Sequence, residues 1–164
     1  VLSWAMVPVT LALSVVLMVP VASAVTGLFL EEVAQAVEDR HYPAMGQAEA
    51  VPFAEGLADS LGFLGTMALA NLLALVLYVV FIPLAPFIFW ALNGFLLGRE
   101  YFVLAAMRRV GRRAAHKLFR RHIAVIWLGG VLMALPLSVP VLNLLVPVLG
   151  AATFTHVYHR LTAV

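Results

Sequence analysis

Hydrophobic residues form three long stretches along the chain, separated by one acidic and one basic stretch. The first, Val1–Leu30, contains Pro8 and Pro20 and exceeds the roughly 20 residues with which a helix crosses a bilayer. Its residues 22–24, Ala-Ser-Ala, resemble a signal-peptidase site, but no basic region precedes the apolar stretch, which favours a membrane helix over a cleaved signal. The abrupt apolar start predicts that the natural N-terminus lies upstream of Val1.

The acidic stretch begins with helical periodicity over Leu28–Tyr42, which is apolar on one side and acidic on the other. This pattern predicts a short amphipathic helix at a membrane interface. Its acids beside His41 could form a metal or acid–base site, but the solvated face of a surface helix has the same composition, and that is the interpretation we adopt. Prolines and glycines then predict a loop over Pro43–Gly56.

Charge decides how often the second apolar stretch, Leu57–Gly98, crosses the membrane, because its length is about two membrane thicknesses. Residues 26–60, which precede this stretch and overlap its first residues, hold seven acids and one base. Arg99–His122, which follows it, holds eight of the ten lysines and arginines. The positive-inside rule favours the basic stretch in the cytoplasm. The contrast therefore predicts that acids and bases lie on opposite sides of the membrane, with a single crossing between them.

A re-entrant hairpin would reconcile a single crossing with this length. We expect Asp59–Phe81 to span the membrane and Pro83–Gly98 to enter it and return, because two prolines near the start of that segment break the helix. The last apolar stretch, Ile123–Thr155, has two arms that flank a proline-containing turn at residues 135–140 and are each too short to cross. It predicts a second re-entrant hairpin.

The basic stretch makes an amphipathic helix if Arg99–His122 is helical. Its cationic side chains then form two neighbouring rows at i,i+4 spacing, beside an apolar face. Such a cluster alone is compatible with nucleic-acid binding, but it joins two apolar stretches, so we expect lipid headgroups as its partners and no nucleic acid. The predicted cytoplasmic basic face consists of Arg108, Arg109, Arg112, Arg113, Lys117, Arg120 and Arg121.

Composition places the whole chain in the membrane class. Hydrophobic residues make up 64% and charged residues 11% of the 164 residues, which fits an integral membrane protein and no ordinary soluble domain. We therefore expect an all-α fold, with residues 1–164 forming one polytopic membrane domain of two long transmembrane helices and two re-entrant helical hairpins. The sequence contains no cysteine, so it offers no disulfide framework and no thiolate chemistry.

Catalytic motifs are not found in the sequence. Ser138 has no nearby His or Asp, and the pair His156 and His159 lacks a third metal ligand, so we expect no enzyme, no cofactor and no metal site. Polar residues at membrane depth instead need a partner, which is either another helix or a passing solute. For Asn93 and Asn143 both interpretations stay open, whereas Asn71 is expected to bind another helix. The candidates for a solute pathway are Asn93, Gly94, Ser138 and Asn143.

Three sequence motifs carry a family resemblance. They are LFLEEVA at Leu28–Ala34, NGFLLGREYF at Asn93–Phe102 with its continuation to Met107-Arg-Arg, and VPVLNLLVPVLGAA at Val139–Ala152. With these motifs the chain resembles the CysZ-type sulfate permease family, the etoposide-induced-protein-domain membrane proteins. The resemblance implies long membrane helices with hemi-penetrating helical hairpins, homo-oligomeric assembly in the bacterial inner membrane, and sulfate uptake that feeds cysteine biosynthesis.

This resemblance gives the expected function, which is membrane transport of a small oxyanion, with sulfate as the first candidate. The family's anion-binding Gly-x-Arg-Arg element would precede Val1, so no sulfate ligand is carried over onto this sequence. The alternative is a non-transporting membrane scaffold or assembly protein. A scaffold would tolerate apolar replacement of Asn93 and Asn143, whereas a pathway would not.

Overall fold

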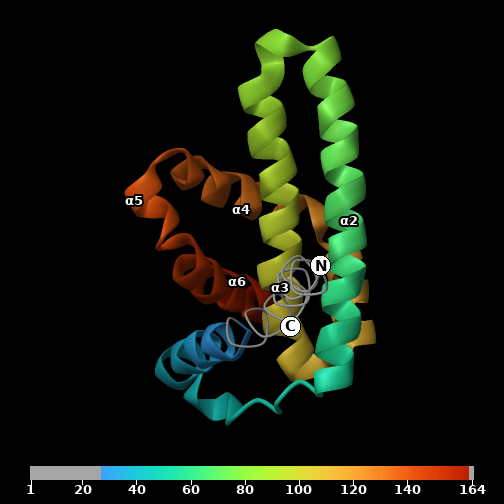
Figure 1. The fold of residues 1–164 in the computed structure, drawn as a ribbon. Coiled ribbons are helices and arrows are strands. Elements are labelled where there is room, and N and C mark those ends of the chain that lie inside the picture. The colour runs from blue at the N-terminus through green and yellow to red at the C-terminus, as the bar shows by residue number, and fades with distance from the viewer. Residues whose placement is uncertain (1–26, 163–164) are drawn as a thin grey trace, which may run out of the picture.

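A computed structural model describes residues 27–162 of the chain, and within this range it contains helices and turns but no strand (Figure 1). The predicted membrane helix Val1–Leu30 lies outside the described residues except for its last four. The first described element is a helix of residues 27–41, here called the acidic helix. A short 3-10 turn, Pro43–Met45, follows it and leads into the loop before the first long helix.

The dominant feature is a tall hairpin of two antiparallel helices, α2 (Phe53–Val80) and α3 (Ala85–Arg121) (Figure 1). The 28 residues of α2 make a helix about 42 Å long, which is enough to cross a bilayer. A 3-10 turn, η2 (Ile82–Leu84), joins the two helices at the tip. By length and composition, the segments Phe53–Val80 and Ile82–Arg121 can each cross a membrane.

The predicted re-entrant hairpin over Pro83–Gly98 is wrong, because residues 85–98 form an unbroken helix, the first part of α3. Pro86 lies in the first turn of α3, where a missing N–H costs no helical hydrogen bond, so this proline starts a helix and does not break one. The chain turns earlier, where Phe81 leaves the helical region with φ −126° and ψ 56°. The break inside α3 comes later, at Gly111, whose φ of 73° is accessible mainly to glycine.

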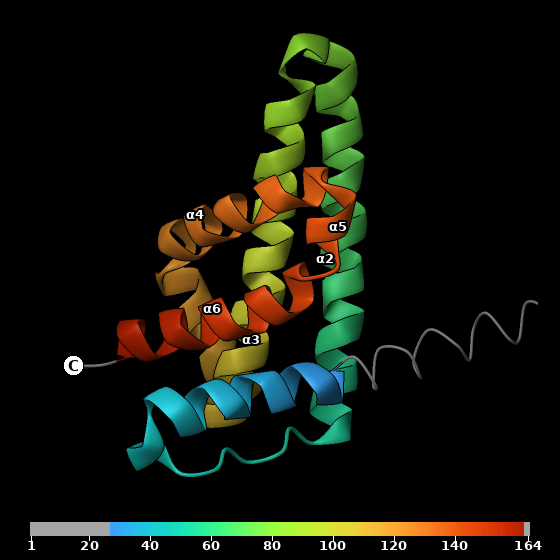
Figure 2. The same ribbon diagram turned by 90° about the vertical axis from the view of Figure 1, so that its left-hand side faces the viewer.

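The C-terminal third of the chain turns back on itself. Helix α4 (Ile123–Ala134) leads through η3 (Leu135–Ser138) and α5 (Pro140–Asn143) into α6 (Val146–Thr162). Figures 1 and 2 show α4 and α6 as two arms that meet at α5 and lie against α3. The 12 residues of α4 span about 18 Å, which is too short to cross a membrane. That this turn stops inside a membrane stays a prediction.

Close helix packing holds this second hairpin against α3. A methyl group on Gly130 of α4 would overlap the carbonyl oxygen of Gly94 in α3, so only glycine allows the two backbones to approach this closely. Around the contact, Phe102, Ile126 and Phe154 are completely buried and form the centre of the core. Gly94, a candidate for the solute pathway, therefore has a packing role in this fold.

Helix α2 contributes little to that core. Ala74 is its one buried residue, and large apolar side chains along its length are exposed. The tip of the hairpin is equally apolar: Ile82 is 72% exposed, and residues 60–98 carry no charge. An apolar surface this extensive fits hydrocarbon and does not fit water.

Candidate functional site

A buried carboxylate joins the acidic helix to the basic end of α3. Glu38 is 1% exposed, and its two oxygens accept hydrogen bonds from Arg109 Nε at 3.0 Å and Nη2 at 2.7 Å. Arg108 Nη1 donates at 3.3 Å, and His159 Nε2 of α6 lies 2.9 Å from Oε1. These four residues, the Glu38 cluster, tie three helices together at the foot of the hairpin.

Electrostatics keep Glu38 ionised despite its burial. Burial by itself would raise the pKa of this carboxyl, but hydrogen bonds from Arg109 and His159 and the positive charges of Arg108 and Arg109 outweigh it, leaving the pKa below its usual value. Gln35 extends the network by accepting a hydrogen bond from Arg108 Nη2 at 2.6 Å. Arg109 also donates to the carbonyl oxygens of Met45 and Gly46, which fixes the loop after the acidic helix.

Aromatic and histidine side chains close this cluster on the side of α6. The Tyr42 ring stacks on His159 with 4.1 Å between ring centroids, and the Tyr42 hydroxyl lies 2.9 Å from His156 Nδ1. Burial, together with the nearby charges of His41, Arg160 and His159, lowers the pKa of His156. A neutral His156 can accept the hydrogen bond that Tyr42 donates. This arrangement connects the end of the acidic helix to α6.

The prediction that acids and bases lie on opposite sides of the membrane is wrong, since Glu38 is ion-paired with Arg108 and Arg109. Two long helices return the chain to the end where it started, and the acids there neutralise arginines. Acidic residues count little in the positive-inside rule. The acidic residues before α2 are therefore a poor guide to orientation. Placing them on the outer side of the membrane led to the prediction of a single crossing between acids and bases, which the ion pairs contradict.

A second acid lies where α2 faces the middle of α3. Asp59 Oδ1 is contacted by three nitrogen groups: Arg99 Nη2 at 3.8 Å, Arg112 Nε at 3.4 Å, and His116 Nε2, which is in hydrogen-bond contact. The guanidinium of Arg99 also lies over the Phe63 ring, 4.9 Å from its centroid. We call Asp59, Arg99, Arg112 and His116 the Asp59 cluster.

The two arginines of the Asp59 cluster are incompletely paired. Both distances to Asp59 exceed the range of a good N–H···O hydrogen bond, about 2.7–3.2 Å. Arg99 Nη1 and Arg112 Nε are buried and have no hydrogen-bond partner in the described part of the chain. Buried donors are nearly always paired, so unpaired guanidinium nitrogens mark a place where a ligand can bind.

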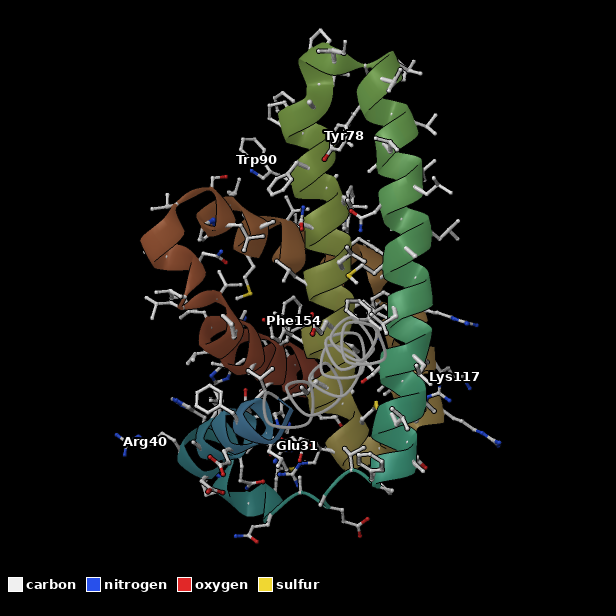
Figure 3. The ribbon with its side chains drawn as sticks, in the orientation of Figure 1. Glu31, Arg40, Tyr78, Trp90, Lys117 and Phe154 are labelled. Atoms are coloured by element: carbon white, nitrogen blue, oxygen red, sulfur yellow. The ribbon has the colours of Figure 1, made fainter. Side chains whose placement is uncertain are left out.

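Beyond the kink at Gly111, the basic stretch opens to the surface. A hollow of about 360 Å³, here called the basic hollow, is lined by Arg112, Arg113, His116, Lys117 and Arg120. Figure 3 shows Lys117 at the foot of the hairpin, far from Tyr78 and Trp90 near the tip. The predicted basic face therefore divides in two: Arg108 and Arg109 turn inward to Glu38, and Arg112, Arg113, Lys117 and Arg120 surround the hollow. Arg121 is exposed at the end of α3.

The predicted pathway residues lie on α3 and the second hairpin, away from the basic hollow. The amide of Asn93 donates at 2.8 Å to the carbonyl oxygen of Phe89 in its own helix. Ser138 Oγ accepts a long hydrogen bond of 3.4 Å from Trp90 Nε1, and Asn143 is exposed at the end of α5. A solute pathway through these residues stays a prediction.

The Asp59 cluster was not identified from the sequence, although a signal was present. Asp59 is the last charged residue before the uncharged stretch of residues 60–98, and Arg99 is the first after it. If that stretch forms a helical hairpin, its two flanking charges meet at the open end. Within residues 27–162, no group of three histidine, aspartate or glutamate side chains is placed to hold a metal ion.

These features define an α-helical membrane protein, with two helices able to cross a bilayer and its basic residues gathered at one end. The model of the family "Sulfate transporter CysZ/Etoposide-induced protein 2.4" matches residues 1–147, and the chain belongs to this family. The resemblance inferred from the motifs is thereby confirmed. Searches of curated proteins and of solved structures gave no significant match.

Proposed function

We propose that this protein carries a small oxyanion across the bacterial inner membrane and that sulfate is its substrate. Membership of a family named for a sulfate transporter supports the substrate. The observation that carries the proposal is the basic hollow, where five cationic or titratable side chains line one concavity at one end of the hairpin. Such a concentration of positive charge raises the local concentration of anions.

The orientation follows from the same charges. Lysines and arginines resist translocation, so the end that holds the Glu38 cluster, the Asp59 cluster and the basic hollow is the cytoplasmic end. The α2–α3 hairpin then extends into the membrane with its uncharged tip leading. The shorter hairpin of α4 and α6 enters the membrane beside it and turns inside the membrane. A full crossing is disfavoured because α4 is too short to span the bilayer and because the helix is interrupted at η3.

Assembly is the remaining part of the proposal. Large apolar side chains are exposed along both the outward face of α2 and the turn at residues 81–84. Lipid covers part of this surface, and copies of the same chain cover the rest, which makes the transporter a homo-oligomer. Asn93 and Asn143 would lie along the pathway, where amide groups replace some of the water lost by the anion.

The test is uptake of radioactive sulfate into vesicles that contain the purified protein. Uptake should exceed that of protein-free vesicles and should be inhibited by excess unlabelled sulfate. The triple variant Arg113→Gln, Lys117→Gln, Arg120→Gln should slow uptake at low ionic strength, and the difference should shrink at high salt because salt screens exposed charge. Uptake equal to that of protein-free vesicles would contradict the proposal and favour the scaffold alternative.

A further inference from the structure

We propose that Arg99 and Arg112 form a binding site for a tetrahedral oxyanion, and that the Asp59 carboxylate occupies this site in the absence of the anion. Sulfate then binds by exchanging with Asp59, which swings away from the two guanidinium groups. The binding site is argued from the contacts of these residues, whereas its use as a gate in transport rests on the function proposed above.

The first argument is the poor match between the donors and the acceptor that holds them. Two guanidinium groups and the His116 imidazole converge on one oxygen, Asp59 Oδ1, and His116 is the group in hydrogen-bond contact with it. The two guanidinium groups lie at 3.8 and 3.4 Å, so Asp59 offers them charge but no good hydrogen bond. Two arginines also face this one carboxylate, and the charge of Glu100 acts on Arg99 as well.

The second argument is the pair of unused donors. Among residues 27–162, Arg99 Nη1 and Arg112 Nε are both buried without a hydrogen-bond partner, and the Arg99 side chain is only 8% exposed. A sulfate or phosphate ion has four oxygens and, when fully ionised, at least two negative charges. It can accept hydrogen bonds from both guanidinium groups at once, which a carboxylate fixed on α2 does not do here.

The Glu38 cluster shows what a purely structural pair looks like in the same protein. Arg109 donates to both oxygens of Glu38 at 3.0 and 2.7 Å, and neither Arg108 nor Arg109 is among the residues with an unpaired buried nitrogen. The arginines of the two clusters lie on neighbouring parts of α3, and each cluster contains one acid, two arginines and one histidine. The unpaired donors around Asp59 are therefore a local property and not a general looseness of this end of the fold.

The third argument is access. Arg112 belongs to the Asp59 cluster and also lines the basic hollow, and its side chain is 37% exposed. An anion gathered in the hollow meets Arg112 first and then the buried Arg99. Phe63 holds the Arg99 guanidinium in place from the side of α2, so that arginine is positioned before the anion arrives.

The experiment is equilibrium binding of radioactive sulfate to the purified protein in detergent. Asp59→Asn removes the competing charge but keeps an oxygen for His116, and it should tighten sulfate binding by about tenfold or more. Glu55→Gln is the matched control, since Glu55 is an exposed acid one turn earlier on α2 and its loss should leave the affinity within about twofold.

Substitution of Arg99 should have the opposite effect on the affinity for sulfate. Arg99→Gln should weaken sulfate binding by at least about tenfold, and Arg99→Lys should weaken it too, because a single ammonium group cannot replace the planar donor pair. Arg40→Gln removes an exposed positive charge from the acidic helix and serves as the control. If Arg99→Gln does not fold, Arg99→Lys, which keeps the charge, still decides the point.

The outcomes separate the site from the transport function. Unchanged affinity in both Asp59→Asn and Arg99→Lys would overturn the site even if wild-type vesicles take up sulfate. Tighter binding in Asp59→Asn without any uptake by wild-type vesicles would uphold the site and overturn the function. A lipid phosphate carries the same oxygens, so binding is repeated in nanodiscs; loss of sulfate binding on adding phosphatidylglycerol would assign the site to a headgroup and overturn free oxyanion binding.

Discussion

Arg109 Nη2 lies 2.7 Å from Glu38 Oε2, across 71 residues of sequence, and this contact fixes the acidic helix to the basic end of α3. The ion pair is buried, with Glu38 1% exposed, and a second arginine and a histidine complete it. Through this contact, the stretch of chain richest in acids lies beside the stretch richest in bases. The foot of the hairpin therefore combines the acidic and the basic residues in one connected network.

The Glu38 cluster should dominate the stability of this end of the protein. Glu38→Gln removes the charge that Arg108 and Arg109 share, and breaking a buried pair in this way costs about 3–5 kcal/mol. We expect a clear drop in thermal stability and faster proteolysis within residues 42–52. Glu32→Gln, an exposed acid on the same helix, is the control and should change little. Equal stability of the two variants would contradict the role of Glu38.

Acid should release the acidic helix. Since the pKa of Glu38 in the folded protein lies below its usual value of 4.5, the carboxylate stabilises the fold at all pH values above that value. This contribution is lost as the pH falls through the lowered pKa of the folded state. Thermal stability measured from pH 7 to pH 3 should therefore fall less steeply below pH 4.5 in Glu38→Gln than in wild type. Parallel curves for the two proteins would count against the assignment.

The contact between Gly94 and Gly130 should tolerate no side chain. Gly130→Ala places a methyl group on the Gly94 carbonyl, and the helices must separate at a cost of about 1–3 kcal/mol. Gly65→Ala is the matched change, because a methyl group there has nothing within 4 Å and α2 should gain about 0.5–1 kcal/mol. Thermal unfolding in detergent measures both. A stabilised Gly130→Ala protein would show that α3 and α4 are not packed this closely.

Substitution by leucine can distinguish asparagines that are needed for sulfate uptake from asparagines that only form a hydrogen bond within their own helix. The double variant Asn93→Leu, Asn143→Leu should abolish sulfate uptake while leaving the oligomer size unchanged. Asn71→Leu is the control, since Asn71 donates to the carbonyl of Met67 at 2.8 Å just as Asn93 donates to Phe89. If the double variant retained full uptake, the asparagines would belong to helix packing.

Some of this fold could be predicted from local sequence. The predicted span Asp59–Phe81 coincides with the last part of α2 except for Phe81, which follows the helix, and the turn in Ile123–Thr155 falls between α4 and α6. In both cases the length of an apolar stretch carries the prediction. The basic helix was also expected, but its kink at Gly111 was not, because a single glycine in a helical pattern does not reveal its backbone angles.

The rest depends on contacts between residues far apart in the sequence. A proline in a sequence can mark either the interruption of a helix or its first turn, and which one applies depends on where the preceding turn ends. Pro86 lies in the first turn of α3. Charges such as Glu38 and Arg109 were assigned to opposite sides of the membrane, whereas the fold pairs them. Charge counts along the chain cannot distinguish separation from neutralisation, since both give blocks of opposite sign.

The central claim is that the acidic helix and the basic end of α3 lie on one side of the membrane, since the proposed orientation depends on it. The chain has no cysteine, so single cysteines can be introduced without background labelling. Three exposed positions serve the purpose: Glu49→Cys in the loop after the acidic helix, Arg121→Cys at the end of α3, and Ile82→Cys at the hairpin tip.

These single-cysteine proteins are treated with a membrane-impermeant maleimide in intact spheroplasts and again after permeabilisation. We predict that Glu49→Cys and Arg121→Cys are both protected in intact spheroplasts and both react after permeabilisation, while Ile82→Cys, surrounded by hydrocarbon, reacts poorly in either case. Reaction of Glu49→Cys from outside while Arg121→Cys stays protected would put acids and bases on opposite sides and contradict the account.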